Sequence, residues 1–163
     1  MRLAAADFAG TWRLSRRIDD ARAGQVGLLE GRAVLTPVPG GLRYDEAGTL
    51  RYGAGPPLQA VRRYLWAFAE GAVEVAFDDG RPFHRFVPEG RAAGTDHPCG
   101  ADHYRVAYDF DHWPDWQATW RVTGPAKDYV LVSRYARDLH GGERWGNQGA
   151  TVATGERHGA GME

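Results

Sequence analysis

The residues best suited to catalysis are His97, Cys99 and His103, which are spaced as H-x-C-x3-H. A thiol beside an imidazole forms a nucleophile and its base, provided that the thiol pKa is lowered and an oxyanion hole is present. The same side chains are zinc ligands, but the paired spacings of structural zinc sites are absent. A turn with Cys99 as a small buried filler is the simpler interpretation. The sequence therefore predicts no metal and no cofactor, and keeps Cys99 with His97 as a candidate catalytic pair.

His84 is a second candidate for proton transfer, because an imidazole titrates near neutral pH. It alternates with Pro82 and Phe86, so the face on which it lies depends on the register of its strand. A histidine in the core or on the surface is the simpler interpretation. Acidic residues and a histidine also surround Trp113-Pro114, and such a polar, proline-containing segment is typical of a turn (Asp109, Asp111, His112 and Asp115).

Arg16 is the candidate for binding an anion. If Trp12 faces the interior of a sheet, the alternation of a strand turns Leu14, Arg16 and Ile18 inward as well. A guanidinium can hold a carboxylate or a phosphate through two hydrogen bonds. The alternative is that Arg16 lies near a rim or pairs with an internal acid, because a buried ion loses several kcal/mol of hydration.

Aromatic side chains supply the other candidate ligand contacts. Four tyrosines lie on the apolar faces of their expected strands, with further aromatic residues as apolar wall: Tyr44, Tyr64, Tyr104, Tyr108, Phe110 and Trp120. A ring with a hydroxyl tip suits a pocket that needs a few polar groups in apolar walls, of about 300–1,000 Å³ in typical ligand sites. Tyrosines that merely fill the interior are the alternative.

The elements that must position these residues are short strands. From Asp102 to Arg137, apolar and polar residues alternate through three segments rich in aromatic and β-branched residues, which is typical of antiparallel strands. Earlier strands are expected at 8–19, 26–38, 41–45, 49–52, 58–70, 73–77 and 81–87, with a short one at 92–96 and a hairpin connection at 46–48. The apolar residues of 58–70 also fit a helical stripe, but the strand is favoured because another strand follows after a one-glycine turn. This pattern predicts an all-β fold, a single antiparallel up-and-down β-barrel of about nine or ten strands.

Composition limits the classes of function. The 163 residues carry a net charge of −1 and fit one domain, expected at 1–137, followed by a flexible Gly-rich tail at 138–163. Because basic residues do not outnumber acidic ones, the sequence predicts no nucleic-acid partner. One cysteine, no signal peptide and no run of about 18 apolar residues predict a cytoplasmic protein without a membrane partner. A homodimer is left open.

The segment Gly10-Thr11-Trp12 before successive antiparallel strands resembles the calycin superfamily of lipocalins, fatty-acid-binding proteins and nitrobindin-like barrels, over roughly residues 8–137. HPCGAD, the aromatic strands and GPAKDY are similar to an uncharacterised bacterial family in that superfamily. The resemblance implies that Trp12 plugs the closed end and that an arginine of the last strand, matched by Arg134, packs across it. The histidine segment of the haem-binding group has no counterpart, so haem is not implied.

Three hypotheses follow from the sequence. The first is a non-catalytic barrel that binds a hydrophobic or amphipathic small molecule, with an anionic group as one option. The second is an enzyme that uses the same cavity, with His84 or with Cys99 and His97 in proton transfer or acyl chemistry. The third is a barrel filled by its own side chains, which acts through its surface.

Overall fold

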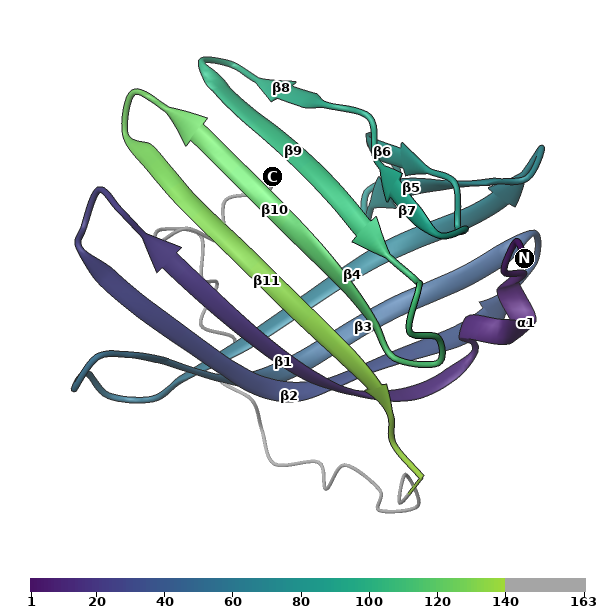
Figure 1. Cartoon of the computed structure of the whole chain (residues 1–163), viewed down its shortest axis with the longest axis horizontal. Helices are drawn as coiled ribbons and strands as arrows, with labels where there is room; N and C mark the ends of the chain where they lie inside the picture. The colour runs from purple at the N-terminus through teal and green to yellow at the C-terminus, as the bar shows by residue number, and fades with distance from the viewer. Residues whose placement is uncertain (140–163) are drawn as a thin grey trace.

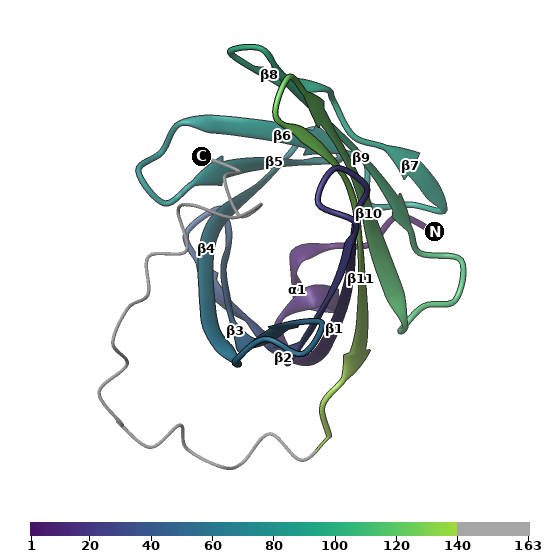
Figure 2. The ribbon, with the colours of Figure 1, turned by 90° about the vertical axis from the view of Figure 1, so that its left-hand side faces the viewer.

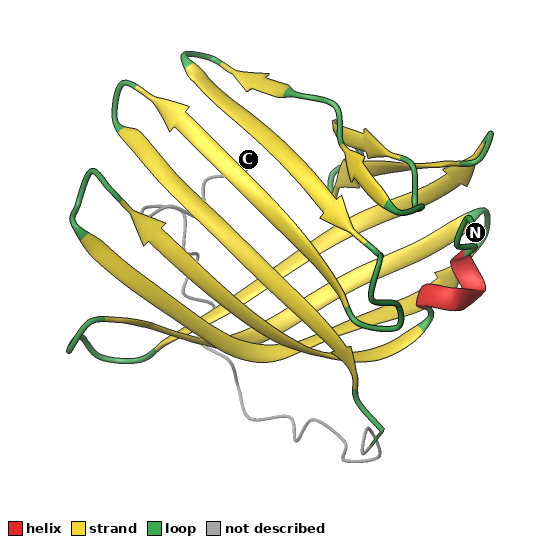
Figure 3. Ribbon diagram, in the orientation of Figure 1, coloured by secondary structure: helices red, strands yellow, loops and turns green. Residues whose placement is uncertain are grey.

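The computed structural model describes residues 1–139, and the tail predicted at 138–163 lies almost wholly outside these residues. The described chain is one antiparallel sheet coiled into a nearly closed barrel, which confirms the predicted all-β barrel (Figure 1). Strands make up about two thirds of the described residues, which contain a single short helix (Figure 3). The elements are α1 (Ala5–Phe8), β1 (Gly10–Asp20), β2 (Gln25–Val38), β3 (Gly41–Tyr52), β4 (Leu58–Ala69), β5 (Ala72–Phe77), β6 (Pro82–Phe86), β7 (Arg91–Ala93), β8 (His97–Cys99), β9 (Asp102–Asp109), β10 (Trp116–Gly124) and β11 (Lys127–Arg137).

The strand order around the barrel is β6-β5-β4-β3-β2-β1-β11-β10-β9-β7, with β8 paired to β9. The last strand therefore closes against the first. Between β6 and β9 the gap is bridged by the segment after β7. The amide of Gly94 donates to the carbonyl of Val106 in β9, and Thr95 exchanges two hydrogen bonds with the backbone of Arg85 in β6, each at 2.9 Å. No helix in the described chain could cross a membrane.

Alternation along the strands decides which side chains enter the lumen. In β1, the side chains of Trp12, Leu14, Arg16 and Ile18 are buried, whereas the residues between them are exposed. The predicted inward face of this strand is thus confirmed, and Arg16 lies inside the barrel with only 6% of its surface exposed.

The expected hairpin at residues 46–48 is wrong, because Gly41–Tyr52 is one continuous strand. Gly48 faces Gly31 of β2, and a Cβ at Gly31 would lie 2.1 Å from the carbonyl oxygen of Ala47. The glycines here allow two strands to approach closely and do not form a turn. The uninterrupted alternation of β3 turns Glu46 into the lumen, where it is 5% exposed.

The helix α1 lies across one end of the barrel (Figure 2). Its last residue, Phe8, is fully buried among aromatic rings, and the indole of Trp12 donates to the Phe8 carbonyl at 2.8 Å. The guanidinium of Arg137 lies 3.9 Å from the centre of the Trp12 ring and donates to the carbonyl of Ala9 at 2.7 Å. The arginine that packs across Trp12 is therefore Arg137 and not Arg134, which alternation turns to the outside of β11.

Candidate functional site

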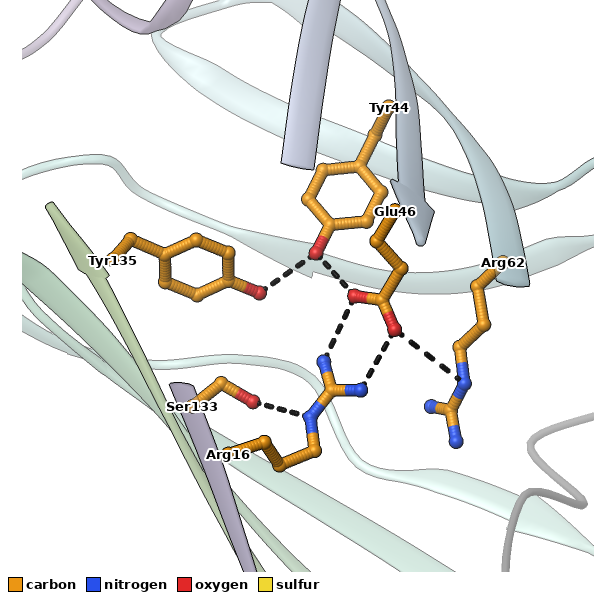
Figure 4. A network of polar contacts seen from close by, with 6 residues as sticks. All are labelled: Arg16, Tyr44, Glu46, Arg62, Ser133 and Tyr135. Carbon is orange, nitrogen blue, oxygen red and sulfur yellow. Dashed lines mark hydrogen bonds and ion pairs between the residues drawn. The ribbon is translucent and has the colours of Figure 1, made fainter. Parts of the chain in front are cut away.

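A cluster of polar side chains lies inside the barrel, and we call it the lumen cluster (Figure 4). It consists of residues from β1, β3, β4 and β11: Arg16, Tyr44, Glu46, Arg62, Ser133 and Tyr135. Arg16 is at its centre. Its guanidinium donates to both carboxylate oxygens of Glu46, at 2.7 and 2.9 Å, and to the hydroxyl of Ser133 at 2.7 Å. Nε, Nη1 and Nη2 of Arg16 thus each donate to an acceptor in the protein, and few N–H groups of this side chain are left for a ligand.

Two tyrosines extend the network from the carboxylate. The hydroxyl of Tyr44 donates to Glu46 at 2.5 Å and lies 2.8 Å from the hydroxyl of Tyr135. Since Tyr44 has a single hydroxyl proton, Tyr135 must donate to Tyr44. Burial alone would raise the pKa of Glu46, but the charge and hydrogen bonds of Arg16 lower it to about 2. Burial also raises the pKa of Tyr135 to about 12, so both tyrosines are neutral donors.

Arg62 is the member of the lumen cluster whose polar atoms are least satisfied. Its Nε lies 3.7 Å from Glu46, and its side chain is only 15% exposed. Its Nη1 atom is buried and has no hydrogen-bond partner within residues 1–139. Two guanidinium groups thus share the single carboxylate of the lumen cluster, which leaves the cluster with one net positive charge.

His84 enters the same interior from β6. A β-bulge opposite Val75 and Ala76 turns both Phe83 and His84 to the inside. The Nε2 atom of His84 lies 2.8 Å from the hydroxyl of Tyr108, whereas its buried Nδ1 has no partner in the described chain. Burial, helped by the charge of His97, lowers the pKa of His84 to about 3, so the imidazole is neutral at physiological pH.

A small cavity joins the lumen cluster to His84. Its volume is about 40 Å³, enough for about three water molecules. Within residues 1–139, this lumen cavity is much smaller than the pocket of about 300–1,000 Å³ that the sequence suggested, because aromatic rings fill the interior. Phe83 stacks on Trp120 at 4.9 Å, and Tyr135 stacks on Trp116 at 3.7 Å.

The structure brings part of the predicted ligand-binding set together. Arg16, Tyr44, Tyr64, Tyr108 and Trp120 all border this cavity. Tyr104 and Phe110 do not: the hydroxyl of Tyr104 accepts a hydrogen bond from Lys127 at 2.9 Å, and Phe110 packs against Phe8 at the end closed by α1. The sequence missed Glu46 and Arg62, although alternation continued through both strands would have turned them inward.

The residues of the H-x-C-x3-H segment do not line this cavity. His97 and Cys99 belong to β8, and the ring of His97 packs edge-on against Phe83 at 5.2 Å. His103 pairs with Asp96 at 3.1 Å. Among residues 1–139, no group of three or more His, Cys, Asp and Glu side chains is arranged to hold a metal ion. Catalysis by Cys99 with His97 stays a prediction.

A larger hollow of about 390 Å³ lies on the outside of the barrel. It follows β1, β11 and β10 and the turn after β9, and it is lined by His112 and by charged side chains of both signs (Arg13, Glu30, Asp109, Asp115 and Arg134). Arg134, which the resemblance assigned to the closed end, thus belongs to the outer face.

Comparison with known proteins identifies a family and related folds. Residues 8–137 match the sequence profile of DUF6314, a family of unknown function. The S-type phycobiliprotein lyase CpeS from Guillardia theta has a similar structure, with a TM-score of 0.56 and 10% identity over 82% of this chain and 89% of the lyase. A DUF3598 protein of unknown function from Nostoc punctiforme gives a TM-score of 0.54 and 12% identity over 82% of this chain and 48% of its own. No curated protein matches the sequence.

Proposed function

Because the chain belongs to DUF6314, a family of unknown function, its function must be inferred from the site, and we propose that the barrel binds a small carboxylate in its lumen with Arg62 as the anion contact. The solved structures share only 10–12% of their residues with the chain, and they support the fold alone. The proposal therefore depends on the chemistry of the lumen cluster.

The observation that carries the proposal is the buried Nη1 of Arg62, which has no partner in the described chain. A buried charged donor left without an acceptor destabilises a fold by the hydration that it has lost. A carboxylate at this position would restore the hydrogen bond and neutralise the excess charge of the lumen cluster. Arg16, the anion contact expected from the sequence, already has Glu46 and Ser133 as acceptors, so we assign the anion to Arg62.

The cavity limits the size of this carboxylate. A volume of about 40 Å³ leaves room for only a few non-hydrogen atoms, so the ligand must be short, and a long fatty acid would have to displace stacked aromatic rings. The aromatic walls around Tyr64, Phe83 and Trp120 give the apolar part of such a ligand its contact area. The small molecule proposed is thus a short-chain carboxylate.

Calorimetric titration with propionate, and with the neutral isostere propionamide, tests this proposal. We expect propionate to bind and propionamide not to bind. Arg62→Gln should weaken the binding of propionate at least 10-fold, because it removes the charge that selects the anion. Arg63→Gln changes the neighbouring arginine, which faces outward and pairs with Asp45, and should change the affinity less than twofold. Equal binding of propionate and propionamide, or equal affinity in Arg62→Gln, would overturn the proposal.

The filled lumen favours a second candidate, a barrel that acts through its surface. The outer hollow of about 390 Å³ falls within the size range of small-molecule sites, whereas the lumen cavity does not. Native mass spectrometry of the purified protein separates the two candidates when propionate is added. A mass increment that disappears in Arg62→Gln supports the lumen site, and one that survives in Arg62→Gln but disappears in Arg13→Gln supports the outer hollow.

A further inference from the structure

We infer that the carboxylate held at Arg62 also carries a hydroxyl group that bonds to Nδ1 of His84, so that the ligand is a short hydroxy acid. This inference rests on the proposed function and names the class of ligand. It starts from the Nδ1 atom of His84, which is buried at the same cavity and also has no partner in the described chain.

The position of His84 is fixed by the backbone. Strict alternation would turn either Phe83 or His84 outward, but the bulge between β5 and β6 places both inside. The imidazole is packed edge-on against Phe83 at 4.6 Å and against Trp120 at 4.8 Å. The ring is thus held on several sides, and it borders the same small cavity as Arg62.

The hydrogen bond to Tyr108 determines what Nδ1 needs. If Nε2 accepts from the Tyr108 hydroxyl, then Nδ1 carries the proton of the neutral ring and requires an acceptor. If Nε2 instead donates to Tyr108, then Nδ1 is a bare acceptor and requires a donor. A hydroxyl group provides both a donor and an acceptor, so it satisfies Nδ1 in either tautomer.

The charge of the site argues for a hydroxyl rather than a second carboxylate. Arg16 and Arg62 face one Glu46, so a single negative charge makes the lumen neutral. The imidazole is surrounded by aromatic rings and burial lowers its pKa, so near pH 7 it is neutral and supplies no positive charge for a second anion. A dicarboxylate such as malonate would bring an uncompensated charge into the barrel, and we expect it to be excluded.

Isosteric pairs of ligands test the inference. Glycolate replaces the methyl of propionate by a hydroxyl, and 3-hydroxypropionate does the same to butyrate, so each pair differs in hydrogen bonding but not in size. In the wild-type protein we expect the hydroxy acid of at least one pair to bind about 10-fold more tightly, and malonate to bind more weakly than either member of the pairs. In His84→Phe, the hydroxy acid and its isostere should bind with affinities that differ less than twofold, so the preference within each pair is lost.

Nitrogen-15 NMR of the His84 ring in the wild-type protein gives a second measurement that needs no variant. The Nδ1 resonance should shift when the preferred hydroxy acid is added and should stay in place when its isostere is added. A water molecule bound to Nδ1, with no role for the ligand, predicts the same Nδ1 shift with both members of a pair, and this result would overturn the inference.

The failures of the two proposals differ. Binding of all four monocarboxylates through Arg62 with no preference for a hydroxyl would refute the hydroxy acid and leave the proposed function intact. If the preference for the hydroxy acid persists in His84→Phe, the hydroxy-acid inference is likewise refuted and the proposed function stays intact. If none of the four monocarboxylates binds, both proposals are refuted.

Discussion

Glu46 places both carboxylate oxygens on the guanidinium of Arg16, at 2.7 and 2.9 Å, and so joins two strands that are not neighbours in the sheet. β2 lies between their strands, β1 and β3, and the pair spans it on the lumen side. Ser133 of β11 binds the same guanidinium from the other side. Arg16 of β1 is therefore bonded to β11, its neighbour in the sheet, and to β3, two strands away on the other side.

Replacing Glu46 by Gln should destabilise the barrel by about 3–5 kcal/mol, because two buried guanidinium groups would then have no carboxylate. Urea denaturation at pH 7 measures the loss. Glu30→Gln is the matched control, since Glu30 lies on the outside of β2 and should change the free energy of unfolding by about 0.5 kcal/mol or less. A loss below about 1 kcal/mol for Glu46→Gln would show that the pair contributes little.

Arg62→Met should leave the free energy of unfolding of the ligand-free protein unchanged or raise it. Arg16 and Glu46 would still neutralise each other, and a buried donor without an acceptor would be removed. Arg16→Met should instead cost about 3–5 kcal/mol, since it removes three hydrogen bonds from buried acceptors. If Arg62→Met loses as much as Arg16→Met in urea denaturation, Arg62 serves the fold and not a ligand.

The stability of the protein should depend on pH through His84. The unfolded imidazole binds a proton below its ordinary pKa of 6.5, whereas the folded one does so only near pH 3, so stability is lost as the pH falls from 6.5. Each pH unit in this window corresponds to about 1.4 kcal/mol, which gives about 2 kcal/mol between pH 6.5 and 5. Glu46 contributes little there, because its ordinary pKa of 4.5 lies below the window.

Urea denaturation at pH 7 and at pH 5 checks this expectation in the wild-type protein and in His84→Phe. The variant should lose about 2 kcal/mol less than the wild type over this interval. The other histidines of the chain are present in both proteins and cancel in the comparison. Equal losses of unfolding free energy in the two proteins would mean that the folded protein binds a proton at His84 as readily as the unfolded chain does.

Alternation was sufficient to predict most of the fold. Trp12, Leu14, Arg16 and Ile18 face the lumen as their period of two requires. It failed at Glu46, because glycine at position 48 after a charged residue is typical of a hairpin, and only the partner strand shows that Gly48 faces Gly31 across a close contact. A close approach between two strands is a property of their register, which one strand alone does not reveal.

The chemistry of the lumen was less predictable than its wall. The pattern indicated that Arg16 points inward, but its partner Glu46 lies 30 residues further along the chain. The position of His84 depends on a bulge that alternation cannot foresee. The size of the cavity depends on how the aromatic rings stack, which composition does not determine.

Arg137→Met should destabilise the barrel by about 1–2 kcal/mol, because its guanidinium lies on the face of the Trp12 ring and donates to the carbonyls of Ala9 and Asp7. Arg134→Met changes an arginine three residues earlier on the same strand, whose side chain is exposed, and should change the free energy of unfolding by about 0.5 kcal/mol or less. Urea denaturation followed by tryptophan fluorescence compares the two variants. Equal losses would mean that the contact with Trp12 adds nothing to the fold, whereas a larger loss for Arg134→Met would restore it as the arginine that stabilises the closed end.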